Sequence, residues 1–195
     1  QIARDLPDTE SAYFWGAQVE VGSYPTSLIP TSGSTVTRNQ DIFTRDGIGS
    51  LINSTEGVLF VEMAALSNDI TARTIGLSDG TTNNRVVLRY ADTSNRVQGF
   101  IQVGGATNGN IFNTSYTITN FLKVAYKWKA GDFALWINGT EVATSTDATS
   151  FSAGVLTEIQ FNEGDGAGNE FFGKVKQLQV YDTALTDDTL ALLTS

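Results

Sequence analysis

From Val58 onward, the chain is a succession of short runs rich in Val, Ile, Phe, Tyr and Thr, separated by Gly, Asn and Asp. β-branched and aromatic residues favour strands, whereas Gly, Asn and Asp tolerate the backbone conformations of tight turns. Asn138-Gly139 is such a turn pair between two apolar runs. The pattern predicts an antiparallel meander and therefore an all-β sandwich. The predicted strands are 58–66, 74–78, 85–91, 96–103, 116–118, 121–128, 133–138, 155–162 and 171–181.

The last part of the chain departs from this strand pattern in two ways. In the last strand, Val175, Leu178 and Val180 break the alternation of apolar residues, which predicts a bulge between Val175 and Leu178. After it, the run Leu185–Leu193 has helical spacing, and Thr186 followed by two aspartates is typical of a helix N-cap. We therefore expect a short C-terminal helix that closes one end of the sandwich.

The first part of the chain has a different composition, because Pro, Gly, Ser and Thr are dense between Gly16 and Arg38. Such a stretch favours an extended, ordered arm. Its expected apolar anchors are Tyr24, Leu28 and Ile29, and Tyr13–Trp15 is expected to belong to a further strand. The sequence thus predicts an extended N-terminal arm or inter-module linker in residues 1–45 and a β-sandwich domain in residues 46–195.

The balance of charges limits the partners and the chemistry of the chain. Twelve basic and 21 acidic residues give a formal net charge of −9, and such a surface repels phosphate backbones and anionic lipids. Histidine and cysteine are absent, so the commonest general base and a thiol nucleophile are missing. Gln1–Glu10 lacks the features of a signal peptide, and no run reaches the roughly 20 apolar residues of a membrane span. We expect neither nucleic acid nor membrane as a partner.

Two stretches resemble known protein families. Residues 14–31, FWGAQVEVGSYPTSLIPT, resemble a junction between modules of phage tail fibre and tail spike proteins. Residues 58–195 resemble the laminin-G-like, concanavalin A-like lectin and glucanase domains. The motifs of this second resemblance are KVAY at 123–126, ALWINGTEV at 134–142, FGKV at 172–175 and VYDTALT at 180–186.

The resemblances imply a concanavalin A-like jelly roll of two antiparallel sheets, carried on the host-contacting appendage of a virion. They imply a virion or extracellular location, a bacterial surface polysaccharide as ligand, and other chains of the appendage as partners, often in a homotrimer. Members of the superfamily bind glycans or proteins, hydrolyse glucans, or act as spacers. Its glucanases carry Glu, Asp and Glu on alternate residues of one strand, and this sequence lacks that triplet.

The candidate glycan-binding residues lie on predicted strands. Sugars are bound through an aromatic ring for the apolar face and through Asn, Asp or Arg for the hydroxyl groups. Arg89, Tyr90, Arg96, Gln98, Phe100 and Gln102 lie on two adjacent predicted strands with alternating polar and aromatic residues. Arg89, Arg96 and Gln98 share one exposed face if the chain forms a hairpin through residues 92–95. Trp136 alternates away from its apolar neighbours, which indicates an exposed stacking ring, and a buried ring is the alternative. For the arginines, the alternative is a charged sheet surface without a ligand.

Two further candidates are acidic. The glycine-rich loop 162–170 supplies hard oxygen ligands of the kind that Ca²⁺ prefers, and a solvated hairpin without an ion is the alternative. Its candidate metal ligands are Asn162, Glu163, Asp165 and Glu170. Glycosidases need a pair of carboxylates, and Glu62 in an apolar strand is the residue that a hydrolase would use. The alternative for Glu62 is a solvated strand face.

Three functional hypotheses follow from the sequence. The leading one is a virion module, in a tail fibre or spike, that binds a host-surface glycan through a lectin-like sandwich. The second is a structural module that extends or trimerises the appendage. The third is a polysaccharide-degrading glycosidase, which the missing histidine, cysteine and acidic triplet disfavour.

Overall fold

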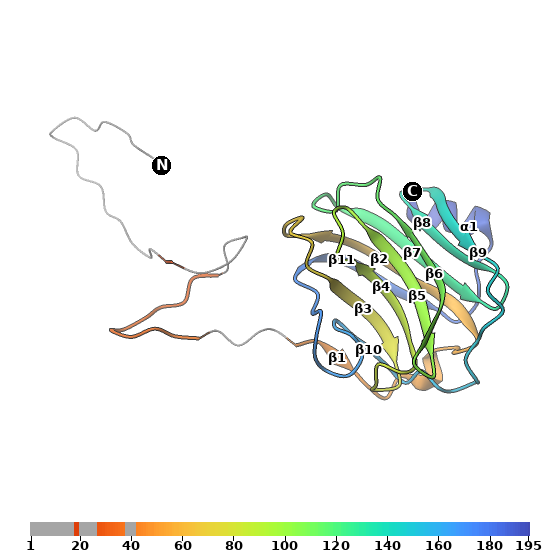
Figure 1. The fold of residues 1–195 in the computed structure, drawn as a ribbon, viewed down its shortest axis with the longest axis horizontal. Helices are drawn as coiled ribbons and strands as arrows, with labels where there is room; N and C mark the ends of the chain where they lie inside the picture. The colour runs from red at the N-terminus through yellow and green to blue at the C-terminus, as the bar shows by residue number, and fades with distance from the viewer. Residues whose placement is uncertain (1–17, 20–26, 38–41) are drawn as a thin grey trace. The chain divides into compact units, whose positions relative to one another are not determined.

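Two antiparallel sheets pack face to face around an apolar core (Figure 1). The computed structural model describes residues 18–19, 27–37 and 42–195, and the sandwich lies in the compact unit 41–195. The six-stranded sheet contains, in spatial order, β1 (Thr44–Arg45), β10 (Glu158–Gln160), β3 (Arg73–Ser78), β4 (Arg85–Tyr90), β5 (Val97–Val103) and β6 (Ala106–Asn113). The five-stranded sheet contains β11 (Gly173–Tyr181), β2 (Glu56–Ala65), β7 (Leu122–Lys129), β8 (Phe133–Ile137) and β9 (Thr140–Ser145).

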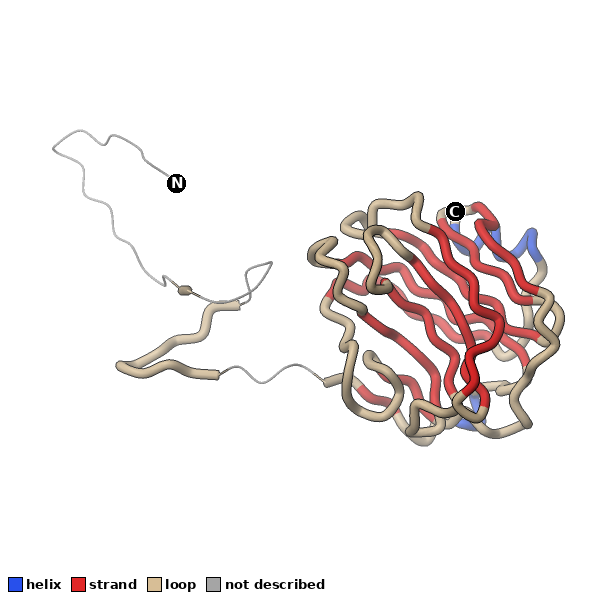
Figure 2. Tube along the Cα trace, in the orientation of Figure 1, coloured by secondary structure: helices blue, strands red, loops and turns tan. Residues whose placement is uncertain are grey.

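The helices are short. The 3-10 helix η1 spans Gly49–Leu51, and α1 spans Asp187–Thr194 (Figure 2). The predicted N-cap of α1 is confirmed, because the Thr186 side chain accepts a hydrogen bond from the Thr189 N–H. The predicted all-β fold with a C-terminal helix is therefore confirmed. No helix in the described part of the chain is long and apolar enough to cross a membrane.

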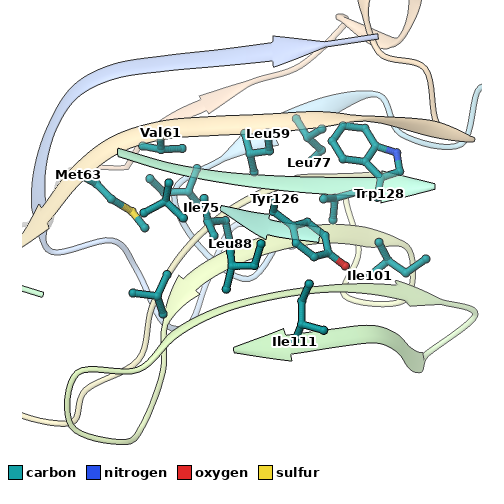
Figure 3. Packing of buried hydrophobic residues seen from close by; sticks show 14 of the residues in the cluster. Leu59, Val61, Met63, Ile75, Leu77, Leu88, Ile101, Ile111, Tyr126 and Trp128 are labelled. Atoms are coloured by element: carbon teal, nitrogen blue, oxygen red, sulfur yellow. The ribbon is translucent and has the colours of Figure 1, made fainter. Parts of the chain in front are cut away.

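The core forms because side chains alternate between the two faces of each strand. Leu59, Val61 and Met63 of β2 point into the space between the sheets, where they lie with Tyr126 and Trp128 of β7 (Figure 3). These side chains are completely or almost completely buried. At about 25 cal/mol per Å² of apolar area removed from water, this burial is the main term that stabilises the sandwich.

Tight turns join neighbouring strands at the predicted Asn138-Gly139 pair and at a second glycine pair that was not predicted. Asn138 and Gly139 have φ values of 49° and 80°, as a two-residue hairpin turn requires. Gly104 and Gly105, with φ values of 58° and 84°, make the equivalent turn between β5 and β6. The predicted bulge in the last strand is also present, because the pairing of β11 with β2 shifts between Val175 and Gln177.

Several predicted strand boundaries are wrong. β1 and β6 were not expected, because β1 is short and β6 is rich in Thr, Asn and Gly rather than in large apolar residues. β9 follows the predicted Asn138-Gly139 turn but was not among the predicted strand ranges. Residues 116–118 form no strand. Instead, the Ile118 side chain packs in the core, and its carbonyl accepts a hydrogen bond from the Ala65 N–H at 2.8 Å. Of the predicted strand 155–162, only β10 pairs with its neighbours.

Helix α1 covers part of the outer face of the five-stranded sheet. It packs against β7, β8 and β9, and Leu190 joins Val58, Phe60, Ala134 and Trp136 in a second apolar cluster beneath it. The side chain of Trp136 is only 7% exposed there. The expectation that Trp136 offers an exposed stacking ring is wrong, because alternation puts it on the outer face but the helix buries that face.

The N-terminal unit, residues 1–40, is described only in part. Its described residues contain no strand or helix, and the Ile29 N–H donates to Gln18 Oε1 at 2.8 Å. Leu28, one of the expected anchors, is exposed. The other expectations, the Tyr24 anchor and the strand at Tyr13–Trp15, fall outside the described residues. Thr44 and Arg45, which were expected in the arm, form β1 of the sandwich.

Candidate functional site

The outer face of β4, β5 and β6 carries a row of polar side chains that bond to one another. Arg89 and Gln98 are direct partners in the register of β4 and β5, so the expected hairpin places them on one face. Arg89 Nε donates to Gln98 Oε1 at 2.9 Å, and Gln98 Nε2 donates to Asn110 Oδ1 at 2.7 Å. The row therefore fixes the orientation of the Arg89 guanidinium group.

A second row runs parallel to the first. Arg85 and Gln102 are also register partners, and Arg85 Nε donates to Gln102 Oε1 at 2.8 Å. Gln102 Nε2 in turn donates to the carbonyl of Gly105 at 2.8 Å. Arg85 Nη1 donates to the carbonyl of Glu163 at 2.5 Å, which ties the loop after β10 to the edge of this face. Each of the two arginines is thus held by a glutamine of the adjacent strand.

Phe100 lies on β5 between the two rows. The guanidinium carbons of Arg89 and Arg85 lie 5.2 Å and 5.7 Å from the centroid of its ring, within the range of a cation–π interaction. The Phe100 side chain is only 5% exposed although it points away from the core. On the inner side of the same strand, Gly99 leaves the space that the Tyr126 ring fills, since a Cβ there would lie 2.2 Å from that ring.

A third guanidinium group extends this face toward the turn between β4 and β5. The guanidinium carbon of Arg96 lies 4.2 Å from the ring centroid of Phe112 on β6. Phe112 is 47% exposed, which makes it the accessible aromatic ring of the face. Arg96 Nε is buried without a hydrogen-bond partner among the described residues. We call this surface the arginine face; it comprises Arg85, Arg89, Arg96, Gln98, Phe100, Gln102, Asn110 and Phe112.

A β-bulge in β6 positions two of these residues. Gly99 pairs with Ile111 and Ile101 pairs with Asn108, so Gly109 and Asn110 together stand opposite Phe100. The extra residue changes the alternation of β6 and brings Asn110 to the outer face. Gly109 has a φ of 54°, a conformation that glycine adopts without strain.

The sequence missed three residues of the arginine face. Asn110 and Phe112 belong to β6, where the bulge hides the period of two, and Arg85 lies at the first position of a strand that was predicted. The signal that was available is the Gly104-Gly105 pair, which marks a hairpin turn and so implies a strand after it.

The charges of the arginine face are not neutralised at close range. In residues 42–195, no guanidinium group of Arg85, Arg89 or Arg96 lies within 4 Å of a carboxylate. Burial lowers the pKa of Arg89, Asp92 and Glu163 oppose that shift, and Arg96 adds to it by repulsion. Burial likewise lowers the pKa of Arg85, with Glu163 opposing. Arginine nevertheless remains protonated at neutral pH, so the face is positively charged.

The other predicted site residues lie elsewhere. Trp136 belongs to the five-stranded sheet and is covered by α1, so it does not contribute to the arginine face. Glu62 is also on the five-stranded sheet, where its carboxylate pairs with Lys176 Nζ at 2.9 Å. Its register partner on β7 is Lys123. The Glu62 carboxylate is therefore bound in an ion pair with Lys176, an arrangement unlike the paired carboxylates of a glycosidase.

The side chains of the acidic loop bond mainly within the loop. Asn162 Oδ1 accepts from the Gly164 N–H at 2.8 Å, and Asp165 Oδ1 accepts from the Ala167 N–H at 3.2 Å. Glu163 bonds to Asn169, and Glu170 accepts from the Gly168 N–H. No group of three or more acidic, His or Cys residues that would hold a metal occurs in the described ranges. The loop oxygens thus bond within the loop, and the Ca²⁺ site stays a prediction.

A family model matches most of the sandwich. Residues 59–191 match the model described as the concanavalin A-like lectin/glucanases superfamily. Among curated proteins, no sequence gives a significant match.

Solved structures show the same fold at low sequence identity. The CBM40 of the Ruminococcus gnavus IT-sialidase, bound to α2,6 sialyllactose, is 15% identical with a TM-score of 0.63, and the alignment covers 78% of this chain and 98% of that one. Domain 4 of a GH43 extracellular arabinanase from Geobacillus stearothermophilus, in complex with arabinotriose, is 15% identical with a TM-score of 0.58, covering 80% and 82%. The SAP-like pentraxin of Limulus polyphemus is 17% identical with a TM-score of 0.56, covering 74% and 72%.

Proposed function

Because the chain belongs to the concanavalin A-like lectin/glucanases superfamily, we propose that it is a binding module that takes a glycan on its arginine face. The fold alone does not determine the function, since this sandwich supports binding, hydrolysis and structural roles. The proposal therefore depends on the side chains of the face, and the observation that carries it is the half-exposed Phe112 ring beside the polar rows of Arg89 and Arg85.

The chemistry of the arginine face suits a sugar. A sugar ring has an apolar face that packs on an aromatic side chain, and hydroxyl groups that bond to amides and guanidinium groups. Phe112 supplies an accessible ring, and the exposed side chain of Asn110 lies close by on the same strand. In the described part of the chain, no helix lies over β4, β5 and β6, whereas α1 packs on the opposite sheet (Figure 1).

The comparisons support a glycan as the ligand. The sialidase module and the arabinanase domain that share this fold were both solved with an oligosaccharide, sialyllactose in one and arabinotriose in the other. Identities of 15% transfer no ligand to this chain, so the identity of its sugar is a matter for experiment.

We place this binding activity on the tail fibre or tail spike of a phage, where the module would contact a bacterial surface polysaccharide outside the cell. The support is the resemblance of residues 14–31 to a junction between modules of such proteins. In that setting the neighbouring chains of the appendage, in a homotrimer, are the expected protein partners. Electron microscopy of a phage labelled with antibody to residues 42–195 tests this placement.

The two alternatives make different predictions. A structural module would have its arginine face covered by another chain of the assembly, whereas a glycan receptor leaves it open to solvent. A glycosidase would use Glu62, and Glu62→Gln would then abolish turnover with folding intact. We expect no glycan cleavage from the chain, because Glu62 is paired with Lys176 rather than with a second carboxylate.

A glycan array tests the proposed function directly. We expect saturable binding to one class of glycan, lost in Phe112→Ala. Phe121→Ala is a matched control, since this ring is 37% exposed and carries Lys176 at 3.9 Å, but it precedes β7 of the other sheet. Binding that is lost equally in both variants, or absent from a well-folded chain, would contradict the proposal.

A further inference from the structure

Within residues 42–195, the three half-buried arginines of the arginine face lack the carboxylate partners that the buried cations Arg73 and Lys127 have. Arg73 is 1% exposed and pairs with Asp69 at 2.7 Å, and Lys127 is 4% exposed and pairs with two aspartates. The chain has 21 acidic and 12 basic residues, so carboxylates are abundant. Because no carboxylate of residues 42–195 lies within 4 Å of these three guanidinium groups, their surface is suited to an anion from outside.

The arginines also retain donors for a ligand. A guanidinium group has five N–H donors. Within residues 42–195, Arg89 makes one side-chain hydrogen bond, which uses Nε. The Nε of Arg96 makes no hydrogen bond to these residues. Arg85 uses Nε and Nη1 and keeps Nη2. The hydrogen bonds to glutamine and the contacts with Phe100 thus orient the guanidinium groups of Arg85 and Arg89 and leave some of their N–H groups free for a ligand.

Arg89 lies close enough to Arg85 on one side and to Arg96 on the other for their charges to interact. Arg89 contributes repulsion at Arg85, and Arg96 contributes repulsion at Arg89, in addition to the effect of burial on each. Glu163, Asp165 and Asp92 offset this repulsion only from beyond 4 Å. An anionic group bound between the arginines would relieve the repulsion and make the charge-assisted bonds for which arginine is suited.

We propose that the ligand of the arginine face is an acidic glycan, whose carboxylate or sulfate groups are held by Arg89 together with Arg85 on one side and Arg96 on the other. This inference rests on the proposed function, and it adds the chemical class of the sugar. The planar, forked donors of arginine match either anion, whereas neutral hydroxyl groups need no such concentration of charge. Phe112 and Asn110 would contact the neutral part of the same sugar.

Pairs of matched polysaccharides distinguish recognition of a carboxylate, of a sulfate and of a neutral sugar. We would titrate the chain by calorimetry with polygalacturonate and its methyl ester, and with dextran sulfate and dextran, after screening an array that contains acidic and neutral glycans. The inference predicts binding to an acidic member and at least tenfold weaker binding to its neutral counterpart, as loss of bonds to a charged group implies. The pair that shows this difference identifies carboxylate or sulfate as the recognised group.

Salt gives an independent readout. Binding of an anion by exposed or half-buried arginines weakens as ionic strength rises, whereas binding of a neutral sugar does not. The net charge of −9 opposes non-specific attraction of a polyanion, so binding would reflect the local face rather than the whole protein.

Variants assign the effect to the face. We expect Arg89→Gln and Arg96→Gln each to weaken acidic-glycan binding about tenfold, and Arg89→Lys to weaken it less, because lysine keeps the charge but loses the fork. Arg45→Gln removes the same charge from an exposed position on β1, at the other edge of the same sheet, and should bind as the unmodified chain does. Near-ultraviolet circular dichroism confirms the fold of each variant, and Arg96→Gln keeps the test valid if Arg89→Gln does not fold.

The outcomes distinguish this inference from the proposed function. Saturable binding to neutral glycans only, insensitive to salt and to Arg89→Gln, would overturn the acidic-glycan inference and leave the glycan-binding function standing. No binding to any array glycan or to the four polysaccharides would overturn both.

Discussion

The cations on the two outer faces of the sandwich have different kinds of partner. On the five-stranded sheet, α1 covers part of the surface, and Lys127 pairs with Asp132 at 2.7 Å and with Asp187 of the helix at 3.2 Å. On the six-stranded sheet, no helix of the described residues covers β4 to β6, and Arg89 and Arg85 are held by neutral glutamines. A charge is neutralised where it is part of the packing and left available where the surface is open.

The difference separates structural residues from candidate functional ones. Burying a charge without a partner costs free energy, so a cation beneath a helix needs its carboxylate. A half-buried guanidinium group that is stacked on an aromatic ring and bonded to an amide is oriented at a smaller cost. Substitutions on the two faces should therefore affect different measurements, with stability lost on one and binding lost on the other.

The largest effect is expected beneath α1. Trp136→Ala should lower the free energy of unfolding by about 4 kcal/mol, because it removes a nearly fully buried aromatic side chain and leaves a cavity. Urea denaturation followed by fluorescence measures the change. Phe112→Ala, on the open face, should cost less than about 1 kcal/mol, and an equal loss in the two variants would contradict the distinction between the faces.

The next effect concerns a buried arginine of the six-stranded sheet that does have its carboxylate. Asp69→Asn leaves Arg73 without its ion-pair partner and should cost about 3 kcal/mol at neutral pH. Burial raises the pKa of Asp69, but hydrogen bonds from Ser67, Arg73 and the Thr71 N–H outweigh it, so the pKa lies well below its ordinary value.

This shift has a defined dependence on pH. A carboxyl group with a lowered pKa in the folded state stabilises that state fully above its pKa in the unfolded chain, about 3.9, and loses the contribution as the pH falls further. The difference in unfolding free energy between the unmodified chain and Asp69→Asn should therefore be constant from pH 7 to about 5 and shrink below about pH 4. Denaturation curves of the two chains, recorded from pH 7 to below pH 4, measure this difference. A difference that is independent of pH would refute the assignment.

A smaller effect is expected for the paired lysine. Lys127→Met keeps a stem of similar length but removes the charge between Asp132 and Asp187, and should cost about 2 kcal/mol. Burial lowers the pKa of Lys127, and the hydrogen bonds to the two aspartates raise it by more, so the pair is stabilising below the pKa of the unfolded lysine. The contribution should fade as the pH rises above about 10.4, which alkaline denaturation of the two chains would detect.

The smallest effect on stability is expected at the unpaired arginine. Arg89→Met removes one bond to Gln98 and the contact with Phe100, but no ion pair, and should cost about 1 kcal/mol or less. Thermal unfolding of Arg89→Met and Lys127→Met at the same pH compares the two faces directly. A larger loss for Arg89→Met would indicate that its charge has a structural role.

The sequence predicted most of the sandwich because its signals are local. The Asn138-Gly139 turn and the capping residue Thr186 each depend on residues a few positions apart, and both are confirmed. The alternation also predicted that Arg89 and Gln98 share a face, since the turn at 92–95 determines their register. These features need no knowledge of the rest of the chain.

The wrong or missing predictions depend on contacts between distant segments. Strand periodicity places Trp136 on the outer face correctly, but only α1, which follows some fifty positions later, decides that this face is buried. The bulge in β6 becomes visible only when that strand is paired with β5, so Phe112 and Asn110 were not recognised.

The sequence by itself therefore determined the class of fold, the acidic balance, and the two strands that carry Arg89 and Gln98. Only the tertiary structure decided which cations find a carboxylate, because Asp187, one partner of Lys127, comes from α1. Residue type and spacing specify secondary structure through local backbone geometry, whereas the availability of a charge for a ligand depends on everything that packs around it.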